Sequence, residues 1–535
     1  MSRGTMASFA VMATADIWSI GLMIAVTLRI SGLPRVWHCR KGNRHLQELA
    51  AHEKYGSVVR IGPDSLSFST LSALKTIHAK GAPVFKGDEF YGLLDGGPEG
   101  GRSVQMERAP DAHAARRRVL DRAMPARDEA FRTINGLAGV FTDVIREQEG
   151  STDTDRGKRV LEVDINQVAS WYGFDLITAL AFGQSLDLLR SDEYRWLPRC
   201  LQDASVFLYW AGFFRYALDL WRRFLGSKWP ARLGMHTAVE AQRYADLADS
   251  QVYRRLDRLA REDEEKVTGI TDAAAGTTDD SKDDEVGTRK KAIKRNDIFG
   301  HLLRANLYSR IDLRADSSLL IAAGSDAVRF TITATLFHWT TQSPPTSLAR
   351  ATAEVRTTSG LTPSTLTDAA VLGSPLRYLR ACVDEAMRLN PPKPSSIPRE
   401  VAPSSGMVID GVVAPPGATV GVCAYALHRD GDIYEPDPHF FRPERWLARP
   451  LDTRMVAAFC PFLKGPRACP GKTVAYLAVQ LALFHLLYAF DVEAADEEAA
   501  EGSGGKVQGG RNDFAFNDWV IGYAQGLNIR FKPRM

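Results

Sequence analysis

The chain has 535 residues, of which 45% are hydrophobic, and this is enough for a substantial core. Its 67 basic and 64 acidic side chains nearly cancel, so its charge gives no indication of a nucleic-acid partner. The six cysteines, at positions 39, 200, 382, 423, 460 and 469, show no C-x-x-C spacing. That scatter argues against a disulfide framework and a zinc site, and suits a reducing compartment.

The N-terminal region contains a mostly apolar run, residues 7–28, that is long enough to cross a bilayer. Asp16 lies near its middle, at a cost of about 2.5–3.5 kcal/mol on insertion scales. Positive charges follow from Arg29 to Lys41, which predicts a cytosolic body. We interpret residues 1–30 as a candidate membrane anchor, and a disordered or core-packing N-terminus is the alternative.

The next segments predict local structure with little chemistry of its own. Residues 45–55 read as a helix, and two strand-like runs at 57–69 are broken at Gly62-Pro63. Residues 164–189 have apolar residues at helical spacing, which predicts a core helix.

A basic helix is predicted around residues 111–118, where His113 and Arg117 are four apart and share one face. A solvated basic face is the usual explanation for such a run. Further along, residues 261–295 and 493–511 have the composition of solvated or disordered inserts.

A long helix is predicted from residue 317 to about 338, and it carries Gly324 and Asp326 in its interior. Glycine in a helix costs about 1 kcal/mol relative to alanine. A helix tolerates that cost where its backbone approaches a ligand. A glycine that allows close helix packing explains the pattern equally well.

An apolar-periodic helix at residues 378–389 is stopped by a diproline. It carries Glu385 and Arg388, which are three apart and can pair on one face. An exposed pair of this kind contributes only about 0.2–0.5 kcal/mol, so a surface bridge is the alternative to a structural role.

Near the C-terminus, Cys469 directly precedes an apolar helix predicted from Lys472 to Phe490. A helix N-terminus favours a thiolate, and the flanking glycines let the backbone pass close to a flat ligand. Arg467 can pair with an acidic group on that ligand. A cysteine thiolate on one face of a planar iron macrocycle fits these features, although a lone cysteine is more often simply buried.

The combined pattern F-x-x-G-x-R-x-C-x-G at residues 462–471 resembles the cytochrome P450 family, the heme-thiolate monooxygenases. The resemblance covers the chain from about Tyr55 to the end. It implies a mainly α fold with a small β-subdomain, and residues 31–535 as the catalytic domain. Within the family, the motifs are similar to fungal enzymes of the benzoate 4-monooxygenase-like branch, many of which act in secondary metabolism.

The resemblance implies that Cys469 is the axial ligand to the iron of heme b. Other positions that match the family's heme-binding residues are Phe462, Gly465, Arg467 and Gly471 in the cysteine loop, and His113, Arg117, Arg399 and His428 as partners of the propionates.

In the family's oxygen-binding helix, an acid and a threonine normally relay protons during oxygen activation. Gly324 and Asp326 match this pattern, but Ala327 stands at the threonine position. Thr331, one turn further on, or a hydroxyl on the substrate is expected to stand in. The family's buried E-x-x-R pair predicts a structural triad of Glu385, Arg388 and Arg445.

The implied reaction inserts one atom of O2 into a small organic substrate, with electrons delivered from NADPH by a cytochrome P450 reductase at the endoplasmic reticulum membrane. Two alternatives remain open on the sequence. One is a heme-thiolate isomerase, dehydratase or rearrangement enzyme that needs no reductase. The other is a non-catalytic heme-binding protein.

Overall fold

The computed structural model describes residues 33–87, 90–92, 101–148, 151–152, 159–213, 232, 235–274, 297–305, 307–341, 346–404, 406–495, 514–524 and 526–534. The candidate anchor at residues 1–30 lies outside the described residues. Within them, helices predominate and the strands form small sheets, which confirms the predicted fold class.

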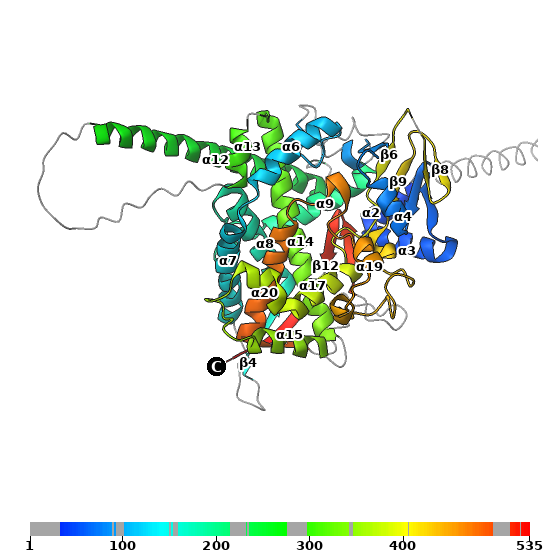
Figure 1. The fold of residues 1–535 in the computed structure, drawn as a ribbon. Coiled ribbons are helices and arrows are strands. Elements are labelled where there is room, and N and C mark those ends of the chain that lie inside the picture. Colours follow the sequence, from blue (N-terminus) through cyan, green and yellow to red (C-terminus); the bar gives the residue numbers. More distant parts are fainter. Residues whose placement is uncertain are drawn as a thin grey trace, which may run out of the picture.

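The helical body is shown in Figure 1. Its helices in chain order are α6 (Pro110–Ala123), α7 (Arg127–Glu147), α8 (Ile165–Phe182), α9 (Leu197–Gly212), α12 (His236–Ala274), α13 (Ile298–Arg304), α14 (Arg310–Thr341), α15 (Thr346–Thr357), α16 (Asp368–Leu372), η3 (Ser374–Leu376), α17 (Arg377–Leu389), η4 (Pro443–Leu447), α19 (Thr453–Ala458), η5 (Gly465–Arg467) and α20 (Lys472–Ala489).

The β-rich end contains the main sheet, with strand order β1-β2-β9-β6-β3, and the helices α2 to α4 (Figure 1). The two strand-like runs predicted at 57–69 are present as β1 and β2, which pair antiparallel on either side of Gly62-Pro63. These elements are α2 (Leu33–Lys41), α3 (Arg44–Tyr55), β1 (Val58–Gly62), β2 (Ser65–Phe68), α4 (Leu71–Ile77), β3 (Val84–Phe85), β6 (Arg399–Val401), β7 (Met407–Ile409), β8 (Val412–Ala414), β9 (Thr419–Val422) and α18 (Ala424–Leu427).

The remaining strands tie the C-terminus to the helical body. One sheet has the order β10-β13-β5-β4, and β11 pairs antiparallel with β12. Their bounds are β4 (Ser151–Thr152), β5 (Arg159–Asp164), β10 (Phe490–Ala494), β11 (Phe516–Trp519), β12 (Ile521–Ala524) and β13 (Asn528–Pro533).

Two predicted boundaries are wrong. The helix predicted for residues 164–189 ends earlier, because Gly183 adopts a left-handed conformation (φ 72°) that terminates α8. The predicted solvated insert at 261–295 begins as helix, since α12 continues to Ala274 and projects from the body (Figure 1). Its remaining residues, 275–295, and residues 496–511 of the second insert lie outside the described ones.

Helices α14 and α20 form the centre of the core. Both are long and apolar enough to cross a membrane by composition, but 67% of each apolar window is buried inside the protein. Helix α14 packs on α8 through two glycines. A Cβ at Gly324 would lie 2.3 Å from Cγ1 of Ile177, and one at Gly173 would lie 2.6 Å from the carbonyl oxygen of Ser325. Only glycine permits this approach, so the close-packing explanation for Gly324 applies.

Candidate active site at the cysteine loop

A cavity of about 300 Å³ lies between α8, α14 and the loop that precedes α20. Most of its wall is apolar, and leucine, isoleucine, valine and alanine side chains of α8, α14, α20 and neighbouring elements form it. Cys469 lines it, and all six cysteines lie in the described part of the chain, where the other five are buried and Cys469 is exposed. The exposed thiol therefore belongs to the cavity wall.

The cysteine loop is held in place by backbone contacts. The Cys469 amide donates a hydrogen bond of 2.9 Å to the carbonyl of Phe462. Gly465 has a positive φ of 72°, and a Cβ there would lie only 1.9 Å from the carbonyl oxygen of His78. Gly471 is sterically freer, since the nearest atom to its Cβ would be the Cys469 sulfur at 3.9 Å. Gly465 is therefore required by the loop itself, whereas protein packing places no such demand on Gly471.

Opposing effects act on the pKa of the Cys469 thiol. The thiol is open to the cavity but enclosed by the surrounding protein, and this burial raises its pKa, although the Gly471 N–H and the charges of Arg117 and Lys393 act in the opposite direction. Desolvation by the surrounding protein therefore opposes the helix N-terminus, which taken alone favours the predicted thiolate. A metal cation would reverse this balance, since a coordinating thiol is deprotonated outright.

Four residues that were predicted to bind carboxylates line the cavity together: His113, Arg117, Arg399 and Arg467. Arg399 donates to the Tyr91 hydroxyl at 2.6 Å, and Arg467 donates to the Glu107 carbonyl at 2.5 Å. Arg117 donates to the Ala468 carbonyl at 2.5 Å and so braces the cysteine loop. No acidic residue is among the described residues of the cavity wall.

His113 is neutral in this setting. Burial and the nearby charges of Arg467 and Lys86 lower the pKa of His113 to about 3. Its contribution to anion binding is then that of a hydrogen-bonding group and not of a charge.

His428 lies elsewhere, and the prediction that it contacts the cavity is wrong. Its ring is fully buried, donates from Nδ1 to the Arg388 carbonyl at 3.0 Å and accepts at Nε2 from the Cys460 amide at 3.0 Å. Both bonds need a neutral ring, and burial lowers the pKa of His428 to about 3. The residue joins α17 to the chain just before the cysteine loop.

On the opposite wall, Gly324, Ala327 and Thr331 of α14 face the cavity. The Thr331 hydroxyl donates to the Ala327 carbonyl at 2.8 Å, so the residue predicted to stand in for the missing threonine is bonded to that position's backbone. Among the described lining residues of α14, Thr331 is the one that carries a hydroxyl.

Asp326 is not among the residues that line the cavity. It forms an ion pair with Arg329 at 3.4 Å and accepts a hydrogen bond from the Tyr523 hydroxyl of β12. Arg329 also donates to Asn166 at 3.0 Å. Burial raises the pKa of Asp326 despite these partners. Arg329 of the same helix and Tyr523 of β12 thus hold the Asp326 carboxylate outside the cavity lining, and its predicted part in proton delivery has no direct contact with the cavity.

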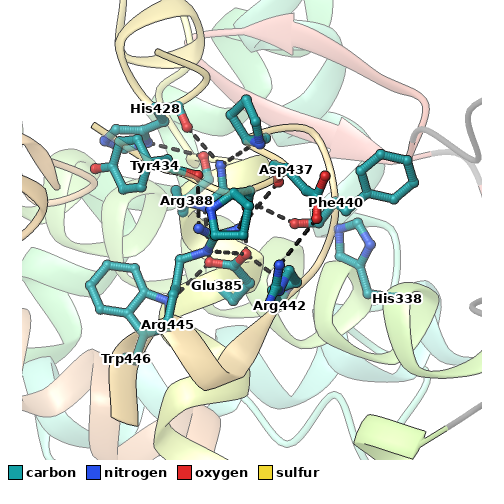
Figure 2. Close-up of polar contacts among 12 residues, drawn as sticks. His338, Glu385, Arg388, His428, Tyr434, Asp437, Phe440, Arg442, Arg445 and Trp446 are labelled. Atoms are coloured by element: carbon teal, nitrogen blue, oxygen red, sulfur yellow. Dashed lines mark hydrogen bonds and ion pairs between the residues drawn. The ribbon is translucent and has the colours of Figure 1, made fainter. Parts of the chain in front are cut away.

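The predicted triad comes together with full burial of Glu385 and Arg388 (Figure 2). Arg388 donates to both Glu385 oxygens, at 2.9 and 2.8 Å, and Arg445 donates to Oε1 at 2.9 Å. The indole of Trp446 donates to Oε2 at 2.9 Å. These hydrogen bonds and charges lower the pKa of Glu385 against the effect of burial.

Arg388 extends the triad into the following loop. It donates to the carbonyls of His428 at 2.7 Å, Pro438 at 2.6 Å and Phe440 at 3.0 Å (Figure 2). The triad lies outside the cavity lining, so its visible role is to hold the chain that leads to the cysteine loop.

Among the basic residues of the described cavity wall, sequence reasoning missed Lys86 and Lys393. Lys86 donates to the Gln105 carbonyl, and burial, together with Arg399 and Arg467, holds its pKa well below the usual range. A signal for Lys393 was present in the sequence, since it is a lysine between prolines directly after the E-x-x-R helix.

The residues fit a flat, largely apolar macrocycle with acidic edges. One thiol faces an apolar cavity, and cations without carboxylate partners in its wall are available for those edges. A thiol can supply one axial ligand to an iron whose other ligands belong to the macrocycle.

Comparisons with known proteins agree with this chemistry. The family model "Cytochrome P450" matches residues 32–505. "Cytochrome P450 monooxygenase fscF" of Fusarium equiseti is 30% identical over 524 residues, covering 95% of this chain and 90% of the relative. "Cytochrome P450 monooxygenase poxM" of Penicillium oxalicum is 28% identical, covering 94% and 88%, and "Cytochrome P450 monooxygenase atnE" of Emericella nidulans is 27% identical, covering 85% and 82%. With its thiol-lined cavity and this match, the chain belongs to the cytochrome P450 family.

Proposed function

We propose that this chain is a heme-thiolate monooxygenase that inserts one oxygen atom from O2 into a small organic substrate in fungal secondary metabolism. The observation that carries the proposal is the exposed Cys469 thiol in an apolar cavity with a cationic edge. Relatives named as monooxygenases, all from fungi, support this reaction class over an isomerase or a non-catalytic heme protein.

In this proposal Cys469 is the axial ligand, and Phe462, Gly465 and Gly471 shape its loop. Arg467, Arg399, Arg117 and the neutral His113 hold the propionates through charge-assisted and ordinary hydrogen bonds. When bound, heme b supplies the oxygen-activating chemistry that no side chain can provide. The apolar wall keeps bulk water out of the reaction site.

Proton handling in this proposal falls to Thr331 and not to Asp326. The Thr331 hydroxyl lies in the cavity wall and can orient a water molecule there. Asp326 has a structural role in this proposal, because its contacts with Arg329 and Tyr523 hold β12 against α14.

Electrons would come from NADPH through a cytochrome P450 reductase. The exposed Arg118 and Arg122 of α6 suit contact with an acidic redox partner, whereas Arg117 lines the cavity. Residues 1–30 would anchor the protein in the endoplasmic reticulum membrane, with residues 31–535 as a catalytic domain on the cytosolic face. The apolar run at residues 7–28 supports this location.

Replacing Cys469 by alanine tests the proposal directly. The reduced wild-type protein with carbon monoxide should show the red-shifted Soret band that gives the family its name, and Cys469→Ala should lose it. Cys460→Ala is the matched control, because it removes a buried thiol that lies 3.5 Å from His428 Nε2 and does not line the cavity, while the backbone amide that bonds His428 remains. A Cys469→Ala protein with unchanged pigment and spectrum would refute the proposal.

Thr331→Val should impair oxygen insertion while leaving the fold intact. Removing a hydroxyl that positions a proton donor typically costs a factor of about 10²–10⁴ in rate. Each allele is introduced into a strain that lacks the gene, and the precursor one oxygen atom poorer than the product is quantified by mass spectrometry. Thr335→Val is the control, since Thr335 makes the same backbone hydrogen bond at 2.8 Å outside the cavity. Equal product from both alleles contradicts the role of Thr331.

A further inference from the structure

Lys393 is a cation that a rigid segment places in the cavity wall. Helix α17 ends before Pro391 and Pro392, and Pro394 follows, so prolines flank Lys393 and restrict the backbone. The half-buried side chain lines the central cavity and a second cavity of about 20 Å³ beside α9. Of the described cations in the central cavity wall, Lys393 alone lines both cavities.

The described part of the chain gives the Lys393 ammonium no hydrogen bond and no ion pair. Asp518, whose charge raises the pKa of Lys393, already accepts hydrogen bonds from Ser395 and from Tyr209, the latter at 3.2 Å. Burial is the larger effect and lowers the pKa of Lys393 to about 8. An ammonium group removed from bulk water without a counter-ion is costly, so this position favours an incoming anion.

The charges of the cavity wall also favour an anionic ligand. Arg117 is paired with Asp121 at 2.7 Å, and the guanidinium groups of Arg399 and Arg467 in the described wall already match the two negative charges of the heme propionates. The Lys393 ammonium then remains as a positive charge without a propionate partner. The lysines and arginines among the described residues of the wall are Lys86, Arg117, Lys393, Arg399 and Arg467, and Lys86 is left out of this balance because its pKa lies well below the usual range.

We propose that the substrate is an organic acid whose carboxylate pairs with Lys393 while its apolar part lies against α8 and α14. This inference rests on the proposed function, because it concerns the substrate of the same cavity. Leu176 and Ile177 of α8 and Leu320 of α14 provide the apolar surface. A charge-assisted hydrogen bond in this low-dielectric setting fixes one end of the substrate and thereby selects the carbon that is oxidised.

A series of ω-(imidazol-1-yl)alkanoic acids and their methyl esters, with increasing alkyl length, tests this proposal in the purified full-length holoprotein. The imidazole nitrogen ligates heme iron whatever the natural substrate is, so binding shifts the Soret band across the series. The tethered carboxylate then reports on Lys393. The proteins titrated are wild type, Lys393→Met, Lys393→Arg and Lys75→Met, which removes a charge on the exposed face of α4.

At one chain length the acid should bind wild type at least about tenfold more tightly than its ester. The preference should disappear in Lys393→Met and persist in Lys393→Arg and Lys75→Met. Equal affinities at every length overturn the proposal, and so does a preference that survives in Lys393→Met. Loss of heme from Lys393→Met would mean that Lys393 binds a heme propionate and not the substrate, and this result would also overturn the proposal. A wild-type protein without the thiolate spectrum refutes the proposed function itself, before acids and esters are compared.

Discussion

Replacing Glu385 by glutamine is expected to lower the free energy of unfolding by about 3–5 kcal/mol, because the change leaves two buried guanidinium groups without their counter-ion. The substitution preserves shape, so the loss reports charge and hydrogen bonding and not a cavity. Arg388 also holds three loop carbonyls, so the disturbance should reach the cysteine loop and reduce heme content. Chemical denaturation and the ratio of heme to protein measure the two effects.

Asp437→Asn is the matched control for this experiment. Asp437 lies in the same loop and pairs with Arg442 at 3.1 Å (Figure 2). Both side chains of this pair are about half exposed. Exposed pairs contribute about 0.2–1 kcal/mol, and asparagine tolerates the positive φ of 62° found there. Similar losses in Glu385→Gln and Asp437→Asn would mean that burial does not matter to the triad.

Gly465→Ala should displace the cysteine loop. The left-handed backbone alone costs about 1–2 kcal/mol for a residue with a Cβ. The Cβ would also lie 1.9 Å from the His78 carbonyl oxygen, a backbone atom that cannot rotate away. We therefore expect a loss of more than about 3 kcal/mol in unfolding free energy, together with poor heme retention.

Gly417→Ala separates the two causes. Gly417 has a comparable φ of 79° with nothing within 4 Å of the added Cβ, so it measures the backbone penalty alone. The losses in unfolding free energy, measured by chemical denaturation, should be larger for Gly465→Ala than for Gly417→Ala. The difference measures the clash of the added Cβ with the His78 carbonyl oxygen. Equal losses would show that the loop yields to the added methyl group.

Patterns that are local in sequence predicted much of the fold and the site. The diproline after Asn390 and the turn at Gly62-Pro63 set boundaries that the structure reproduces, because proline and glycine act on the backbone where they stand. The pairing of Glu385 with Arg388 follows from helical spacing, and the structure brings Arg445 to the same carboxylate.

Features that depend on distant packing could not be predicted. The direction of Asp326 is fixed by Tyr523, which lies 197 residues away in sequence. The pKa of Cys469 depends on burial by segments from the whole chain, and that effect opposes the local helix N-terminus. Both ring nitrogens of His428 form hydrogen bonds with backbone groups, one with Arg388 and one with Cys460. The residues next to His428 in sequence give no indication of these partners.

At Gly324 the backbone of α14 lies against the Ile177 side chain, and at Gly173 the backbone of α8 lies against the Ser325 carbonyl. Neither glycine can be replaced without forcing α8 and α14 apart, so the spacing of these helices is fixed. The part of the cavity wall that α8 and α14 form therefore has a fixed position. Adaptation to new substrates has to come from side chains elsewhere in the cavity wall, such as Val104 and Gln105 or Lys393 and Ile397. Laboratory evolution for altered scope should accordingly accumulate changes in those two places and leave both glycines untouched.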